Sequence, residues 1–102
     1  MELIVAIVER GKANGVSKAA VAAGAGGATV FVGRGAGEHT FSFFGSMKID
    51  PGKEIVWILA EDDKVEMLFK EVSAAAQTNL RGRGLVFTVP VSRVSGLGAD
   101  KK

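Results

Sequence analysis

The stretch EDDKVEMLFKEVSAAAQTNLRGRGLVFTV, residues 61–89, decides the fold that we expect for this chain. Its first three residues are acids, which the positive end of a helix dipole favours. Apolar side chains then recur at helical spacing: Val65, Leu68, Phe69, Val72, Ala75 and Ala76. Asn79 and Gly82 end the predicted helix, and residues 85–89 are apolar and β-branched. The stretch therefore predicts a helix, a glycine turn and a strand in succession.

The first part of the chain has the same order of elements. Residues 3–8 predict a strand that Glu9 and Arg10 cut off. Asn14 is a candidate cap for a helix whose apolar face consists of Val16, Ala19, Ala20 and Ala23. A glycine-rich turn at 24–27 precedes a second strand at 28–32, and a third strand at 55–60 leads into the stretch above.

Two βαβ units in succession are typical of the ferredoxin-like α+β fold. We expect a double βαβ sandwich in which a four-stranded antiparallel sheet carries two helices on one face. A single domain would span residues 1–102, with a long loop at about 37–52 and a flexible tail at about 98–102.

The first and third strands predict that this sheet is covered on both faces. They are apolar at nearly every position, whereas a sheet with one solvated face alternates apolar and polar residues. Two helices cover only one face. We therefore expect another copy of the chain to cover the second face.

Composition excludes several classes of protein. The chain has 102 residues, a net charge of +2 and no cysteine, so it lacks a disulfide framework, a thiolate nucleophile and a zinc-finger pattern. Its apolar runs are too short to span a bilayer, and residues 3–8 make a poor signal peptide. Neither a basic stripe nor stacking aromatics indicate nucleic-acid binding. We expect a cytoplasmic protein with no direct membrane insertion and no nucleic-acid partner.

Nothing in the sequence indicates catalysis. The sole histidine, His39, stands beside Glu38 without metal-ligand spacing, and no G-x-S-x-G nucleophile motif is present. We predict no catalytic residue, no metal site and no obligatory cofactor.

Two glycine-rich stretches are the candidate binding sites. Residues 33–37 and 82–84 combine glycines, which allow close backbone approach, with arginines that supply fixed charge. One interpretation is an anion or nucleotide site. The other is a pair of surface turns with solubilising arginines, because short glycine motifs often occur without a ligand.

Aromatic residues in the long loop also have two interpretations. Phe41 and Phe43 alternate as in a hairpin arm, and Phe44 follows them. Such a hairpin packs on its own domain, or it presents an apolar surface to a partner protein.

Over nearly its whole length the chain resembles the PII family of nitrogen-regulatory signalling proteins, in particular members with a shortened regulatory T-loop. The motifs that carry the resemblance are the opening strand at 3–8, Gly27-Ala28-Thr29-Val30, Gly35-Ala36-Gly37, Asp62-Asp63, Thr78 with Gly82-Arg83-Gly84, and Pro90-Val91.

The resemblance implies a homotrimer that binds ATP, ADP or AMP in clefts between subunits. Ile7, Thr29 and Gly35 would line the adenine and ribose, and Gly37, Gly82 and Gly84 would offer N–H groups to phosphate. Arg81 or Arg83 would supply positive charge. The loop with Glu38, His39, Phe41, Phe43 and Phe44 would contact a regulated membrane transporter or enzyme.

The chain departs from the family pattern near the phosphates. Leu85 replaces the lysine after the second glycine, Glu38-His39 replaces a basic-Gln pair, and Gly96-Leu97-Gly98 occupies the place of a C-terminal Arg-x-Arg. Fewer positive charges favour ADP, AMP or another adenylated ligand over tightly bound ATP. Two alternatives remain, namely a CutA-like trimer that binds no nucleotide and a small ferredoxin-like enzyme.

Overall fold

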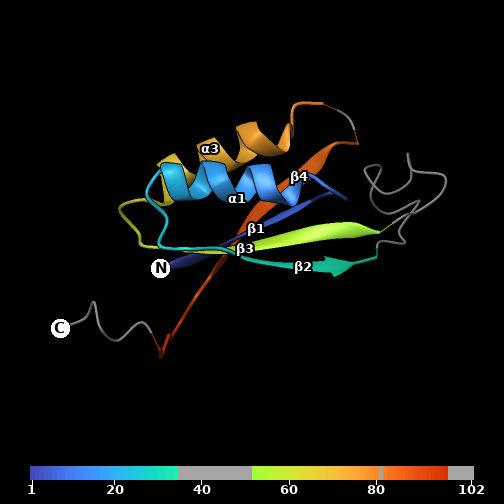
Figure 1. Ribbon diagram of the computed structural model, residues 1–102. Coiled ribbons are helices and arrows are strands. Elements are labelled where there is room, and N and C mark those ends of the chain that lie inside the picture. Colours follow the sequence, from blue (N-terminus) through green and yellow to red (C-terminus); the bar gives the residue numbers. More distant parts are fainter. Residues whose placement is uncertain (35–51, 81, 97–102) are drawn as a thin grey trace.

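The computed structural model describes residues 1–34, 52–80 and 82–96. Its elements run in the order β1 (Glu2–Glu9), α1 (Ala13–Ala22), β2 (Thr29–Gly33), β3 (Lys53–Ala60), α3 (Val65–Ala76) and β4 (Gly84–Pro90) (Figure 1). All of the predicted long loop except Gly52, and all of the predicted tail, lie outside the described residues.

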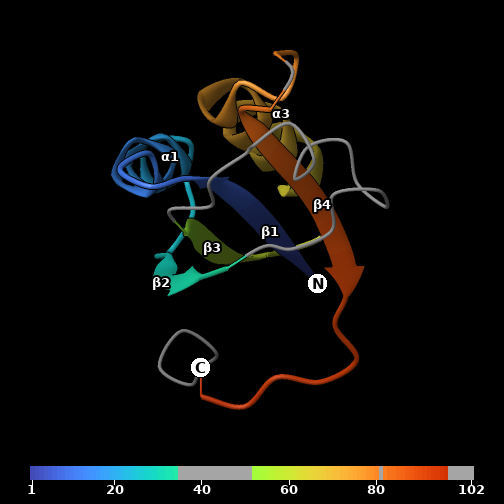
Figure 2. The same cartoon turned by 90° about the vertical axis from the view of Figure 1, so that its right-hand side faces the viewer.

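The strands form one antiparallel sheet in the order β2-β3-β1-β4. Both helices lie on the same side of this sheet (Figure 2). The order and the two-layer arrangement confirm the predicted ferredoxin-like α+β fold. Pro90 is the last residue of β4, an edge strand, where a missing N–H leaves no gap in a central ladder.

The core lies between the sheet and the helices. Successive side chains of a strand point to opposite faces, and the even-numbered residues of β1 and β3 form the buried side, with Ile4, Val8 and Ile58 fully buried. The helices contribute seven residues to the same core: Ala13, Val16, Ala20, Val65, Leu68, Val72 and Ala76. The predicted helix faces are thus largely confirmed, although Phe69 is half-buried and Ala75 is exposed.

Helix α1 begins differently from the prediction. Its first residue is Ala13, so Asn14 lies inside the helix and is not the cap. The carboxylate of Glu54 on β3 performs the capping role, because its Oε1 accepts hydrogen bonds from the N–H groups of Gly11 (3.0 Å) and Ala13 (2.9 Å). N–H groups at the start of a helix have no backbone acceptor, and a carboxylate in this position accepts their hydrogen bonds.

Helix α3 also has different limits. It begins at Val65, so the acids at 61–63 precede it, and it ends at Ala76 rather than near Asn79. Gln77 follows in a left-handed conformation with φ 57°. The N–H groups of Gln77 and Thr78 donate to the carbonyls of Ala74 and Ser73, which closes the last turn.

The odd-numbered residues of the sheet form a second apolar face, which we call the open face. Neither α1 nor α3 covers it (Figure 2). Trp57, Leu59, Phe31, Phe87 and Val89 are each between 39% and 46% exposed. The prediction that both sides of the sheet are apolar is therefore confirmed for the described strands, whereas the trimer stays a prediction.

Candidate functional site

The glycine turn before β4 lies beside the end of β1. Register pairs Val8 with Gly84 and Ile7 with Leu85. Gly82 has a positive φ of 77°, which L residues rarely adopt. The N–H of Arg83 donates to the carbonyl of Leu80 at 3.3 Å, and the Arg83 side chain is exposed. The turn thus places an exposed arginine just before the start of β4, beside the end of β1.

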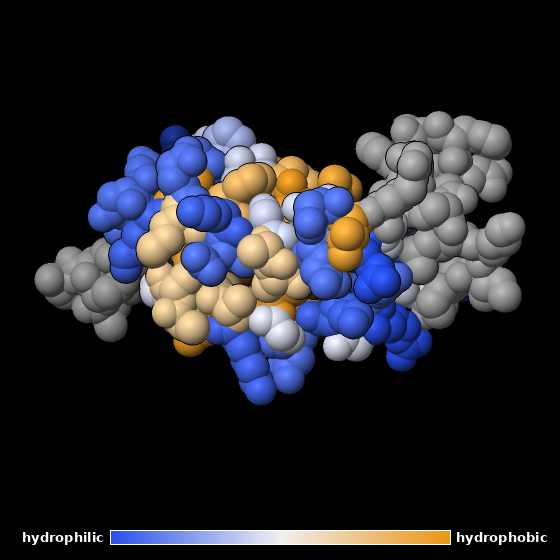
Figure 3. All heavy atoms as spheres, turned by 90° about the horizontal axis from the view of Figure 1, so that it is seen from above, coloured by the Kyte–Doolittle hydropathy of each residue, from blue (hydrophilic) through white to orange (hydrophobic). Residues whose placement is uncertain are grey.

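Further cationic residues stand at this end of the sheet. Lys53 begins β3 and pairs in register with Glu9 and Gly33, and only 2% of its surface is exposed. Arg34 directly follows β2 and is exposed. In the view from the helix side, hydrophilic residues lie at both ends of the molecule (Figure 3). Positive charge at one end of the sheet suits an anionic ligand.

Gly84 has a structural reason to be glycine. It packs so closely on the end of α3 that a Cβ would lie 2.4 Å from the Ala76 carbonyl oxygen. A contact under 3.0 Å requires a shift of backbone. The close packing accounts for the glycine at position 84 without a ligand.

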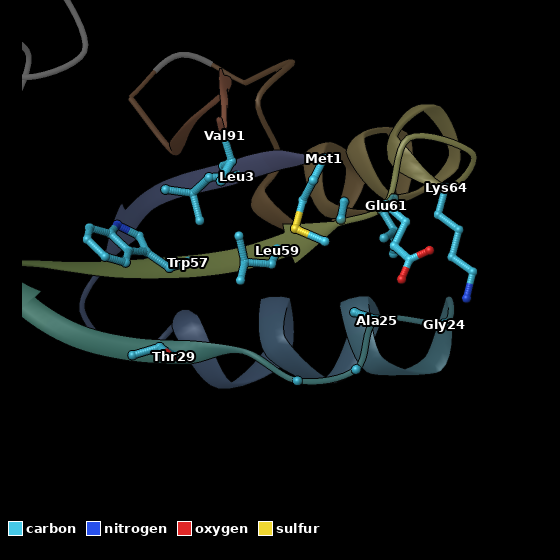
Figure 4. Close-up of a pocket in the computed structure, with 14 residues that line it drawn as sticks. Met1, Leu3, Gly24, Ala25, Thr29, Trp57, Leu59, Glu61, Lys64 and Val91 are labelled. Carbon is cyan, nitrogen blue, oxygen red and sulfur yellow. The ribbon is translucent and has the colours of Figure 1, made fainter. Parts of the chain in front are cut away.

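Thr29 borders a hollow at the opposite end of the open face (Figure 4). The hollow has a volume of about 720 Å³. Its walls are the turn that joins α1 to β2, the start of β1, the end of β3 and the start of α3; they include Gly24, Gly26, Gly27, Leu3, Trp57, Leu59, Glu61 and Lys64. A hollow of this size, mainly apolar with a few polar groups, is typical of small-molecule sites.

Aromatic and charged side chains occupy different ends of this hollow. Trp57 lies near Thr29, whereas Lys64 and Glu61 lie at the far end (Figure 4). The Trp57 ring meets Phe31 edge to face, with centroids 5.3 Å apart and planes at 88°. The hollow therefore offers an aromatic surface at one end and both a carboxylate and an ammonium group at the other.

The described residues of the predicted site fall into two groups. The first group lies where β1 ends and β4 begins, and consists of Ile7, Gly82, Arg83 and Gly84. Thr29 lies on β2, and β3 stands between it and β1. One copy of the chain therefore does not bring all of them together.

Other predicted site residues lie outside the described part of the chain. They are Gly35, Gly37 and Arg81, together with the loop residues Glu38, His39, Phe41, Phe43 and Phe44. Sequence reasoning in turn missed Trp57 and Leu59 as hollow residues. One feature of the sequence could have identified them. They are large apolar side chains at the odd positions of a strand whose even positions fill the core.

The described residues hold neither a candidate metal cluster nor a helix that could span a membrane. Residues 1–34, 52–80 and 82–96 contain no group of three His, Cys, Asp or Glu side chains that could hold a metal ion. Within the same part of the chain, neither helix has the length and apolar character needed to cross a membrane.

Comparison with known proteins gave two matches. The sequence profile of the family described as nitrogen regulatory protein P-II matches residues 1–101. A protein of Microchaete diplosiphon named nitrogen regulatory protein P-II is 31% identical over 114 residues, an alignment that covers 100% of this chain and 96% of that protein.

Proposed function

Because the chain belongs to the P-II family of nitrogen regulatory proteins, we propose that it is a trimeric signalling protein that binds an adenine nucleotide between its subunits. ATP, ADP and AMP are the candidate ligands. The protein acts on a membrane transporter or an enzyme in the cytoplasm and catalyses no reaction itself. Residues 1–102 form a single domain in this proposal.

The open face supports the trimer. It carries the partly exposed side chains of Leu3, Trp57, Leu59, Phe87 and Val89 on adjacent strands. Apolar surfaces of this extent on a small domain are typical of interaction sites. Burial against further copies would remove them from water.

The hollow beside Thr29 is the observation that carries the proposal of nucleotide binding. Its volume of about 720 Å³ lies within the range of small-molecule pockets. It is open on the same face that the trimer would cover, so a second copy would complete its walls. Thr29, one of the three residues that the family resemblance assigns to the adenine and ribose, lines it.

The glycine turn at 82–84 supports the phosphate half of the site. Gly82 has a positive φ, as in turns that bind anions, and the exposed Arg83 adds a guanidinium. Backbone N–H groups in such a turn form a concave site for anions. A cleft between two copies would join this turn of one copy to the Thr29 hollow of another.

Partner binding is assigned to the loop from Glu38 to Phe44, including His39, Phe41 and Phe43. The support is compositional, because aromatic residues supply much of the energy of protein interfaces. A CutA-like trimer without nucleotide is the alternative, since it would use the same open face for assembly.

Titration calorimetry with ATP, ADP and AMP, paired with sedimentation analysis, tests the proposal. We expect a trimer at micromolar concentration and saturable binding of at least one nucleotide, with one site per subunit. A trimer that binds none of the three would favour the CutA-like alternative. A well-behaved monomer would contradict both.

A further inference from the structure

We propose that Trp57 contacts the base of the nucleotide. Through this contact, the site binds a nucleotide or nucleoside more tightly than a phosphate compound that has no base. This inference rests on the proposed function, since it assigns a role within the same site. Neither the sequence motifs nor the family resemblance points to Trp57.

Trp57 is placed to meet a ligand. It lies in the middle of β3 on the open face, where 46% of its surface is exposed, and it lines the hollow. Its register partners are Val5 on β1 and Thr29 on β2. The indole therefore stands beside Thr29, one of the residues assigned to the adenine and ribose.

The indole is also held in position before any ligand arrives. The edge-to-face contact with Phe31 restricts its rotation. A side chain that is already ordered loses less conformational entropy when a ligand binds it. An ordered aromatic surface of this kind is suited to stack on a planar base.

The turn that precedes β2 leaves room for a flat ligand. Side chains are absent at Gly26 and Gly27, and a Cβ built at either position would meet nothing within 4 Å. The apolar side chain of Leu59 extends the floor of the hollow next to Trp57. A planar, largely apolar ring fits these surroundings better than a free phosphate does.

Burial of Trp57 between two copies of the chain is the competing role. Phe87 allows the two roles to be separated, because it is an aromatic residue of the open face, 40% exposed, that does not line the hollow. Both residues pair in register with Val5. A loss that follows from weaker assembly would therefore appear in Phe87→Leu as well as in Trp57→Leu.

Calorimetry on the full chain and three variants tests the proposal. Stacking of a base on an aromatic residue corresponds to roughly five- to 150-fold in affinity. We expect Trp57→Leu to lower the affinities for ADP and for adenosine by the same factor, within that range. The affinity for pyrophosphate should not change. Trp57→Phe should recover most of the loss, and Phe87→Leu should bind ADP as the parent does while sedimenting as the parent does.

Fluorescence gives a second measurement that needs no substitution. Trp57 is the sole tryptophan and the chain has no tyrosine, so emission excited at long wavelength reports on this residue alone. We expect ADP and adenosine to change the emission with the affinities found by calorimetry, and pyrophosphate to leave it unchanged.

The outcomes distinguish this inference from the function on which it rests. If the parent binds ADP while its emission stays constant and Trp57→Leu binds equally well, Trp57 does not contact the base and the proposed function stands. An equal loss in Trp57→Leu and Phe87→Leu, with weakened assembly in both, would assign Trp57 to the subunit interface. If the parent binds neither ADP nor adenosine, the proposed function itself fails.

Discussion

The backbone of Gly84 lies against the carbonyl of Ala76, at a distance that leaves no space for a side chain. This contact joins the end of α3 to the start of β4. It links the turn assigned to phosphate to the core, because Ala76 is itself a buried core residue.

Gly84→Ala should therefore destabilise the fold. The added Cβ would lie 2.4 Å from a backbone oxygen, and overpacking of this kind costs about 1–3 kcal/mol. Urea denaturation measures the loss. Gly15→Ala is the control, because a Cβ at this helix position meets nothing within 4 Å and alanine in a helix stabilises by about 0.5–1 kcal/mol. Unchanged stability of Gly84→Ala would show that the chain relaxes without cost at this contact.

Glu54→Ala should lower stability through α1. The substitution removes the acceptor of the Gly11 and Ala13 N–H groups, and loss of a helix cap costs about 0.5–2 kcal/mol. Glu54→Gln keeps an oxygen acceptor, so it should lose less. Glu71→Ala, on the exposed side of α3, controls for the removal of a carboxylate. Equal stability of Glu54→Ala and the parent would mean that water caps the helix as well as the carboxylate does.

A charge on the open face should prevent assembly. Phe87→Glu places a carboxylate on a surface that the trimer would bury, and burial of an unpaired charge is strongly unfavourable. We expect smaller species by sedimentation. Val21→Glu is the matched control, since Val21 is 53% exposed on α1, and it should sediment as the parent does. Assembly through the helix side would be indicated if only Val21→Glu dissociated.

Arg83→Ala should weaken the binding of phosphate-bearing ligands selectively. A charge-assisted hydrogen bond contributes about 1.5–3 kcal/mol, which is roughly ten- to a hundred-fold in affinity. Calorimetry should show this loss for ADP and none for adenosine. Lys70→Ala, an exposed cation on α3, should change neither. An equal loss for ADP and adenosine would mean that Arg83 does not contact the phosphates.

The elements and their faces could be predicted because they follow local periodicity. The continuous apolar run at residues 3–8 matches β1, and the helical spacing of Val65, Leu68 and Val72 matches the core face of α3. The antiparallel order also brings residues 7 and 82–84 together, since consecutive βαβ units determine which strand ends meet.

The helix ends and the hollow could not be predicted because they depend on distant residues. Glu54 is 41 positions from Ala13, whereas capping rules consider the neighbouring sequence, where Asn14 was the candidate. Gln77 takes a left-handed conformation that the rules assign to glycine. The pairing of Trp57 with Thr29 requires the register of β2 and β3, which no motif in the sequence determines.

The cap at Glu54 also depends on the alignment of β3 with its neighbouring strands. A slip of β3 by one residue would turn Trp57 and Leu59 toward the helices and the core residues Val56 and Ile58 toward solvent. The same slip would bring Lys53 or Ile55 to the start of α1, and neither side chain accepts a hydrogen bond. Misaligned chains would therefore lose the hydrogen bonds that cap α1 together with the packing of the core. An incorrect register would destabilise the helix layer and the sheet at the same time.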